Sequence, residues 1–548
     1  MNNQKMGQER YHSLDAARGL LMLIGIYFHI IVFHYEGSWL GLVGWSTHYF
    51  RMHTFFLISG FFSALVLYRK GHYQMLDNRF KRILLPLITL AWPIWILLTF
   101  GMKFNELRYE NGILSSLKQS LFQYIEEPWV LIPWETMHLW FLSFLFFMSL
   151  FSYILRNRFS NNFFLKISKK SVRLIFDKPW IGMLVFCFSY GLLLSALNKF
   201  EAQGKGGWSS WIWVFKENGL KTFLAFSFFY FVGWQMYHFQ EKMVHISILT
   251  YFKTLLIFSI FINIINYSLY YFGYNNPIPK INAMHRNFYG LNDDKLDPNR
   301  KKQKVTFLVN MSNEAVLSGK GDTAAVYVCI LELGEPSGIK MTDLGNDIWK
   351  STIELNPGVY EYKFRNGLHE NWGGEPDGWE NRKKLDLGGC GFGEYDNRKF
   401  KLENKDIMLG IFCWSECSDC SGNDIPFTWS KEEQKKENYE VFLVNKLFIF
   451  LMNFLVPAYT MLVLSFFVRF CSKPSKKLKY ISDSAYWIYI IHLPLSFFIP
   501  AFFHQSNIHY FVKFLISSLI VTLICFSSYH YFIRNSFLGK FLNGKKFN

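Results

Sequence analysis

Apolar blocks of about 20 residues recur through most of this 548-residue chain. A helix of that length crosses the hydrocarbon core of a bilayer. The chain is 51% hydrophobic and 20% aromatic but only 18% charged, a composition that soluble domains seldom have. We therefore predict an all-α polytopic membrane protein with about ten transmembrane helices, at about 14–35, 48–68, 83–101, 137–155, 180–198, 221–240, 246–272, 442–470, 481–503 and 511–533.

The net charge of +17 is unevenly distributed. Residues 276–441 contain 22 Lys and Arg and 27 Asp and Glu, a net charge of −5, so the rest of the chain carries +22. The positive charge gathers in alternate breaks between apolar blocks, such as 69–82, 156–178 and 471–480. Because cytoplasmic loops retain Lys and Arg, the pattern predicts cytoplasmic termini and a non-cytoplasmic insert. It argues against nucleic acid as a partner.

The polar insert has the pattern of β-structure. Runs such as VTFLVNMS, AAVYVCILEL and GVYEYKF are rich in β-branched and aromatic residues and alternate with NPG, NG and GG turns. This spacing predicts an all-β sandwich over 305–420. The flanks 276–304 and 421–441 have linker composition, which divides the membrane domain into 1–275 and 442–548.

The insert contains five of the eight cysteines: Cys329, Cys390, Cys413, Cys417 and Cys420. Disulfides are expected outside the cytoplasm, and the sequence leaves their pairing open. The run FCWSECSDC also resembles a zinc site, but a fourth ligand at the usual spacing is not obvious. No metal is therefore predicted.

The segment RGLLMLIGIYFH places Arg18 and His29 in the first apolar block. Eleven helical steps turn about 20° past three full turns and rise about 16 Å. The two residues then share one face, with Arg18 at the cytoplasmic end and His29 near mid-membrane. A titratable residue at that depth is usually functional. The alternative is a buried histidine hydrogen-bonded to a neighbouring helix.

Further polar residues interrupt other apolar blocks. They occur in RMHTFFLISGFF, RFKR, PWETMHLWFL and SDSAYWIYIIHLPL. The two arginines of RFKR also fit ordinary cytoplasmic charges, and the histidine of PWETMHLWFL also fits an interfacial residue. The candidates are Ser59, Arg79, Arg82, Glu135, His138, Ser484, Tyr489 and His492.

In this order, SLDAARG, FFLISGFF, R-x-x-R, HLWFL and SAYWIYIIH resemble the membrane acyltransferase 3 family, and within it the group that acts on periplasmic glucans. The resemblance covers about 13–275 and 442–533. It implies a bacterial inner-membrane enzyme that transfers a succinyl or acetyl group from cytoplasmic acyl-CoA to sugar hydroxyls on the far side. It also implies the following roles: His29 at the centre of catalysis, Arg18, Arg79 and Arg82 on the donor, and Ser484, Tyr489 and His492 lining the site.

The residue chemistry agrees with those roles. Arginine matches the phosphates of CoA. A neutral His29 is able to take a proton from an attacking hydroxyl or to accept the acyl group itself, and we favour the first role. Glu135 and His138, at the outer end of their block, are candidates for binding the acceptor.

The insert resembles small β-sandwich modules related to starch- and glycogen-binding modules, which implies that it holds a glycan. Such modules usually carry an aromatic stretch after the second strand, where this chain has CILELGEPSG. Trp372 and Trp379 offer replacement stacking surfaces for sugar. The alternatives are a spacer or a protein-interaction module.

Two other functions compete with acyl transfer. A transporter or flippase without chemistry of its own fits ten spans with buried histidines, although the chain shows no convincing internal repeat. A membrane-anchored glycan receptor would need only one span. The acyl group, the acceptor glycan, the use of an acyl-enzyme intermediate and the oligomeric state are left open by the sequence.

Overall fold

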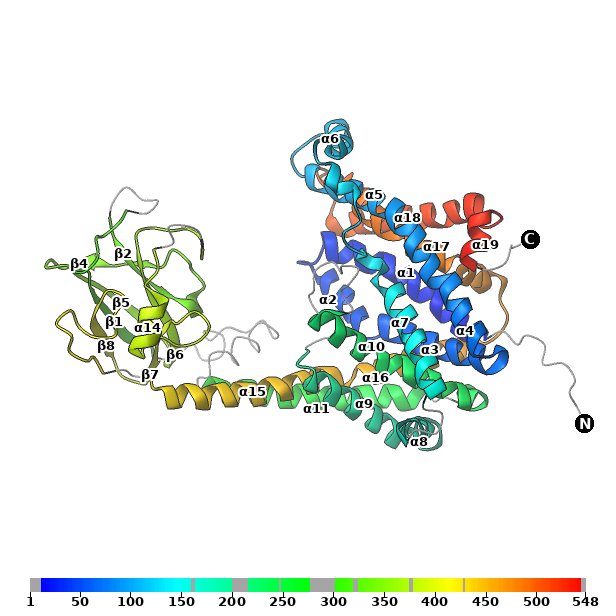
Figure 1. Ribbon diagram of the computed structural model, residues 1–548, viewed down its shortest axis with the longest axis horizontal. Coiled ribbons are helices and arrows are strands. Elements are labelled where there is room, and N and C mark those ends of the chain that lie inside the picture. The colour runs from blue at the N-terminus through cyan, green and yellow to red at the C-terminus, as the bar shows by residue number, and fades with distance from the viewer. Residues whose placement is uncertain are drawn as a thin grey trace, which may run out of the picture. The chain divides into compact units, whose positions relative to one another are not determined.

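The computed structural model describes residues 11–158, 163–199, 215–245, 248–275, 301–318, 324–373, 378–426 and 429–543. The chain divides into two compact units (Figure 1). The first unit is helical and combines Met1–Ile260 with Ile449–Asn548. The second unit, Phe261–Phe448, contains the inserted β-structure.

The helical unit is built from two distant parts of the chain. The N-terminal part contains α1 (His12–His34), α2 (Trp39–Ser46), η1 (Thr47–Tyr49), α3 (Arg51–Lys70), α4 (His72–Arg79), η2 (Phe80–Leu84), α5 (Leu85–Leu107), α6 (Ile113–Glu126), η3 (Pro128–Leu131), η4 (Met137–Leu139), α7 (Trp140–Arg158), α8 (Phe163–Asp177), α9 (Pro179–Ala196), α10 (Glu217–Met236), η6 (Tyr237–His245) and the start of α11 (Ile248–Asn275). The C-terminal part contains the end of α15 (Lys431–Phe454), then α16 (Val456–Phe470), α17 (Lys476–Ala501), α18 (Tyr510–Ser528), η8 (Tyr529–Ile533) and α19 (Phe537–Asn543).

Within the described residues, nine helical stretches are long and apolar enough to cross a membrane. They confirm the prediction of a polytopic helical protein and correspond to nine of the ten predicted spans. The tenth predicted span, 221–240, overlaps α10, which is helical over 20 residues but is not among the nine. Its sequence mixes Phe with Lys, Tyr, Trp and Gln, and these residues lower its mean hydropathy.

Helix α10 packs against α3 at a crossing of two glycines. A Cβ atom on Gly60 would lie 1.8 Å from the carbonyl oxygen of Tyr230, and a Cβ on Gly233 would lie 1.8 Å from that of Leu57. The two backbones therefore touch directly, as small residues allow between membrane helices. This contact fixes α3, which begins at Arg51.

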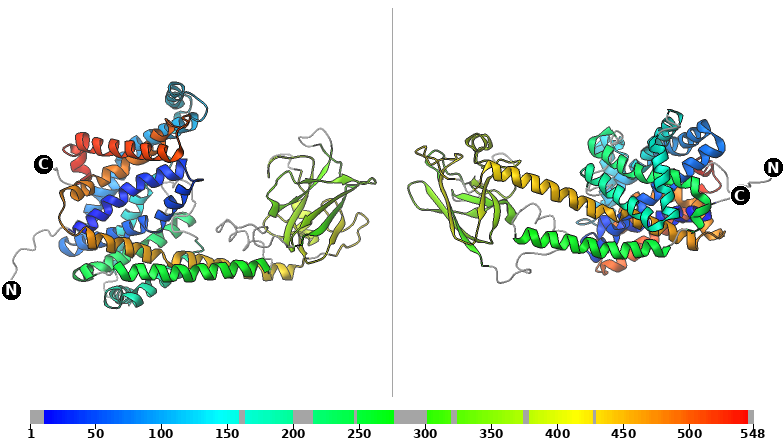
Figure 2. Two further views of the ribbon diagram at one scale, coloured as in Figure 1. Left: turned by 180° about the vertical axis from the view of Figure 1, so that it is seen from behind. Right: turned by 90° about the horizontal axis from the view of Figure 1, so that it is seen from below.

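The insert contains two four-stranded sheets, which Figure 2 shows from two further sides. The first sheet has the order β4-β5-β1-β8, in which β1 pairs antiparallel with β5 and parallel with β8. The second sheet has the order β3-β2-β6-β7 and is antiparallel. The strands are β1 (Gln303–Asn310), β2 (Val326–Ile330), β3 (Ile339–Lys340), β4 (Thr342–Asp343), β5 (Ile348–Leu355), β6 (Gly358–Asn366), β7 (Arg398–Leu402) and β8 (Ile407–Cys413).

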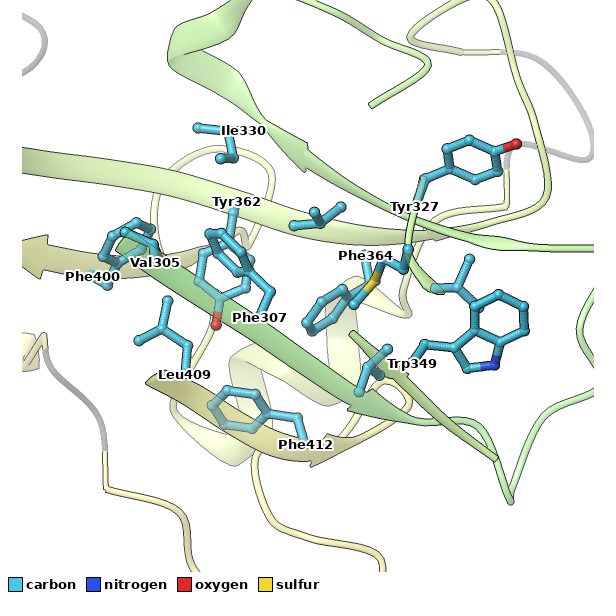
Figure 3. Close-up of a cluster of buried hydrophobic side chains, with 14 of the residues drawn as sticks. Val305, Phe307, Tyr327, Ile330, Trp349, Tyr362, Phe364, Phe400, Leu409 and Phe412 are labelled. Carbon is cyan, nitrogen blue, oxygen red and sulfur yellow. The ribbon is translucent and has the colours of Figure 1, made fainter. Parts of the chain in front are cut away.

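One hydrophobic core joins the two sheets (Figure 3). Phe307 of β1 packs edge-on against Tyr362 of β6 and Phe400 of β7. Beside this core, Arg398 and Glu380 form an ion pair with side chains 2% and 0% exposed. The sandwich predicted from alternating apolar and turn residues is therefore present.

Disulfides join Cys390 to Cys417 and Cys413 to Cys420, whereas Cys329 is a buried free thiol. The sequence predicted disulfides without a pairing. Among the described residues, no group of three or more His, Cys, Asp or Glu side chains is placed to hold a metal ion.

The element boundaries differ from the predicted linkers. Strand β1 already begins at Gln303, inside the predicted linker 276–304, of which 276–300 lie outside the described residues. Helix α15 begins at Lys431, inside the predicted linker 421–441. Its polar composition has a structural reason, because Glu437 of α15 forms a buried ion pair with Lys399 of β7.

Candidate functional site

Three histidines from three segments meet inside the helical unit. Helix α1 carries His29, and it packs against α17, which carries His492 (Figure 1). The ring centroids of His29 and His492 lie 5.2 Å apart. His138, from η4, has its ring centroid 5.5 Å from that of His492. We call His29, His138 and His492 the histidine cluster.

A proline in α17 explains how His138 is held. Pro494 has no backbone N–H, so the carbonyl of Ile490, four residues earlier, lacks its usual helical donor. His138 Nε2 lies 3.1 Å from that carbonyl oxygen. A carbonyl only accepts, so Nε2 carries the proton and Nδ1 remains as an acceptor in the neutral ring. The hydroxyl of Tyr489 donates in turn to the carbonyl of His138.

The ring of His492 is oriented by its own helix. Its Nδ1 lies 2.9 Å from the carbonyl oxygen of Tyr489 and 3.0 Å from that of Ile488, so Nδ1 donates. Nε2 of neutral His492 is then an acceptor. Nε2 of His492, Nδ1 of His138 and Nδ1 of His29 are buried, with no hydrogen-bond partner among the residues that the structure describes. The cluster therefore presents unused proton acceptors in a buried setting.

A cavity of about 380 Å³ in the helical unit is lined by three arginines and by Asp15 and Asp483, but by none of the cluster histidines. Arg18, Arg79 and Arg82 line it, and so does Tyr489, whose ring centroid is 5.4 Å from that of His138. Arg79 donates to Ser63 Oγ at 2.8 Å, and its Nε is buried without a partner in the described part of the chain. The structure thus brings together the three arginines that the sequence singled out and connects them to the cluster through Tyr489.

The remaining candidates have different surroundings. Ser59 lines the cavity. Ser484 does not line it, and its buried hydroxyl donates to the carbonyl of Ile481 in the same helix. Glu135 is partly exposed, three residues before His138. The structure places His138 inside the histidine cluster, and the acceptor-binding role of Glu135 and His138 stays a prediction.

Trp372 and Trp379 form a separate stack in the β-sandwich. Their rings are 6.1 Å apart and inclined by 7°, and the guanidinium of Arg365 lies 4.2 Å from the centre of the Trp379 ring. Trp379 also donates its indole N–H to the carbonyl of Trp372. Trp372 is 46% exposed, so its side chain offers an aromatic surface to solvent.

Arg51 is a site residue that the sequence analysis did not single out. It begins α3, is 5% exposed, and lies with its guanidinium 4.3 Å from the ring centre of Phe28, the neighbour of His29. The available signal was a charged residue within the predicted second span, 48–68. Charges at such positions are rare and usually functional.

The acyltransferase 3 family model, described as an acyltransferase domain, matches residues 11–291. Proteins called glucans biosynthesis protein C from Escherichia coli strains SMS-3-5, 536 and K12 are each 32% identical over 195 residues. The match covers 33% of this chain and 48% of each relative, so the chain spans about half the length of those relatives. No solved structure matches the chain.

Proposed function

The chain belongs to the acyltransferase 3 family, and on that premise we propose that it is an integral-membrane O-acyltransferase. It moves a succinyl or acetyl group from cytoplasmic acyl-CoA to hydroxyls of a glycan outside the cytoplasm. The observation that carries this proposal is the cavity lined by three arginines and by Tyr489, whose ring lies 5.4 Å from that of His138 in the histidine cluster. It combines a phosphate-binding mouth with a buried proton acceptor.

The donor end of the site is the cavity mouth. Arg18, Arg79 and Arg82 line the cavity and offer several guanidinium groups to the phosphates of CoA. Lys70 and Leu542 line the same cavity as Arg18. Lys70 belongs to the basic break after α3, and Leu542 belongs to the C-terminal helix α19, so both segments lie at the same end of the helical unit as Arg18. Because basic loops face the cytoplasm, this grouping supports donor entry from that side.

The chemical step uses His29 as general base. His29 takes the proton of the acceptor hydroxyl while the hydroxyl oxygen attacks the thioester carbonyl carbon. The carbon–sulfur bond then breaks, and the thiolate of CoA receives the proton from His29. His138 and His492, neutral and fixed by carbonyl contacts, shape the pocket around the reacting groups.

The inserted β-sandwich supports the proposal that the acceptor is a glycan outside the cytoplasm. Two disulfides support a location outside the reducing cytoplasm, in the periplasm of a bacterial inner-membrane protein. The exposed face of Trp372 suits stacking on a sugar ring. The insert would then hold glycan for the membrane domain, and the name of the relatives supports a glucan as the acceptor.

The experiment that tests this function separates chemistry from transport. Detergent-purified protein is incubated with glucan and with succinyl-CoA or acetyl-CoA labelled in the acyl group. Release of free CoA thiol together with label that stays on the glucan until mild alkali cleaves the ester supports the enzyme. Absence of both products with either donor would contradict acyl transfer and favour a transporter.

A further inference from the structure

Arg51 is an uncompensated cation in the interior of the helical unit. Its Nη1 is buried and lacks a hydrogen-bond partner within the described residues, and no carboxylate there forms an ion pair with it. Burying a guanidinium without an anion is energetically costly, because the charge loses its hydration and gains no partner. Packing on the Phe28 ring offsets part of this cost and leaves Nη1 unused.

The unused nitrogen points toward the histidine cluster. A Cβ atom on Gly25 would lie 3.2 Å from Arg51 Nη1 and 3.9 Å from His492 Nε2, so both nitrogens border the same small space. Gly25 lies one helical turn before His29, on the same face of α1. A side chain at position 25 would fill the space that these groups surround.

We propose that Arg51 binds the anionic oxygen that forms on the acyl carbonyl carbon during transfer, which makes it a catalytic residue of the site. This inference rests on the proposed function. When the acceptor oxygen bonds to the carbonyl carbon, the π electron pair moves onto the carbonyl oxygen, and Arg51 Nη1 donates to that oxygen. When the carbon–sulfur bond breaks, the carbonyl reforms and the sulfur leaves with the electron pair.

The geometry assigns different roles to His29 and Arg51 during the attack on the carbonyl carbon. His29 accepts the proton that the hydroxyl loses, and Arg51 stabilises the negative charge that appears on the oxygen. A fixed cation in a site of low dielectric stabilises such a charge more strongly than water does. The carbonyl of the resting thioester is neutral, so the interaction strengthens as the reaction proceeds and acts on kcat.

The test compares Arg51→Gln and Arg51→Lys with a matched control, Arg108→Gln. Arg108 is also buried, at 3% exposure, but it donates to the carbonyl of Asn111 and to Gln505 and lies in the segment after α5. Each protein is assayed with acetyl-CoA and succinyl-CoA. Its thermal midpoint and its affinity for S-ethyl-CoA, a thioether without the carbonyl oxygen, are measured in parallel.

The proposal predicts that Arg51→Gln lowers kcat by about 100- to 1,000-fold with both donors. Affinity for S-ethyl-CoA stays unchanged, Arg51→Lys retains more activity than Arg51→Gln, and the control stays within a few-fold of wild type. If Arg51→Gln lowered kcat only with succinyl-CoA, the proposal would be overturned, because Arg51 would then bind the distal carboxylate of the acyl group. A loss of S-ethyl-CoA affinity alongside the loss of kcat, or a kcat equal to that of wild type, would also overturn it. Wild-type protein without transfer would instead refute the underlying function.

Discussion

Replacing Gly233 with alanine tests the glycine crossing that fixes α3 beside the site. The added Cβ would lie 1.8 Å from the Leu57 carbonyl oxygen, whereas real Cβ contacts stay beyond 3.0 Å, so the helices must separate locally by more than 1 Å. The Leu57 carbonyl oxygen belongs to the backbone, so no change of side-chain rotamer relieves the contact. Overpacking of this kind costs about 1–3 kcal/mol. It would also displace Arg51, and a shift of about 1 Å near reacting groups lowers turnover by about 100-fold.

The assay is thermal unfolding in one detergent, followed by size-exclusion and intrinsic fluorescence, with acyl transfer measured on the same sample. Gly37→Ala is the control, because a Cβ there meets nothing within 4 Å. We expect a lower midpoint and lower transfer for Gly233→Ala and neither change for Gly37→Ala. Equal midpoints for the two variants would refute the direct backbone contact between α3 and α10.

Three further predictions concern the donor mouth, the insert and its core. Arg79→Ala is expected to raise the KM for acyl-CoA about 10-fold with a smaller change in kcat, measured by steady-state kinetics, because a guanidinium at the mouth binds ground and transition states alike. Trp372→Ala is expected to weaken binding to immobilised glucan without lowering the thermal midpoint, since the side chain is 46% exposed. Unchanged binding would favour a spacer or protein-interaction role for the insert. Glu380→Gln is expected to destabilise the insert by about 3–5 kcal/mol, seen as faster proteolysis between 305 and 420, because it leaves the buried Arg398 unpaired.

The helical spans followed from the sequence because span length and hydropathy act locally along the chain. The sandwich followed because strand and turn residues alternate in the insert. Helix α10 shows where this reasoning weakens. A helix over most of this block was predicted, but α10 lies against α3 with about half of its side chains buried, so protein contacts partly replace the lipid contacts that hydropathy measures.

The cluster shows why a site is harder to predict than a span. Arg18 and His29 share a helix, so helical periodicity relates them. The place of His138 depends on a carbonyl of Ile490 that Pro494 leaves free on a helix more than 350 residues away. The charge of Arg51 inside a predicted span was visible in the sequence, but only the structure shows that its guanidinium lies on Phe28 beside the cluster and that no carboxylate in the described part of the chain pairs with it. Such relations between distant segments are not contained in local patterns.

The central claim is that His29 performs the proton transfer, and comparing His29→Gln with His53→Gln tests it most directly. His53 is also buried, but its ring contacts Tyr190 and Phe229 away from the cluster. Single-turnover transfer from labelled acyl-CoA to glucan is followed in both variants, after matched thermal midpoints and S-ethyl-CoA affinities are established. We expect His29→Gln to slow ester formation by about 100-fold or more and His53→Gln to stay within a few-fold of wild type. A His29→Gln protein that transfers at nearly the wild-type rate would contradict the account.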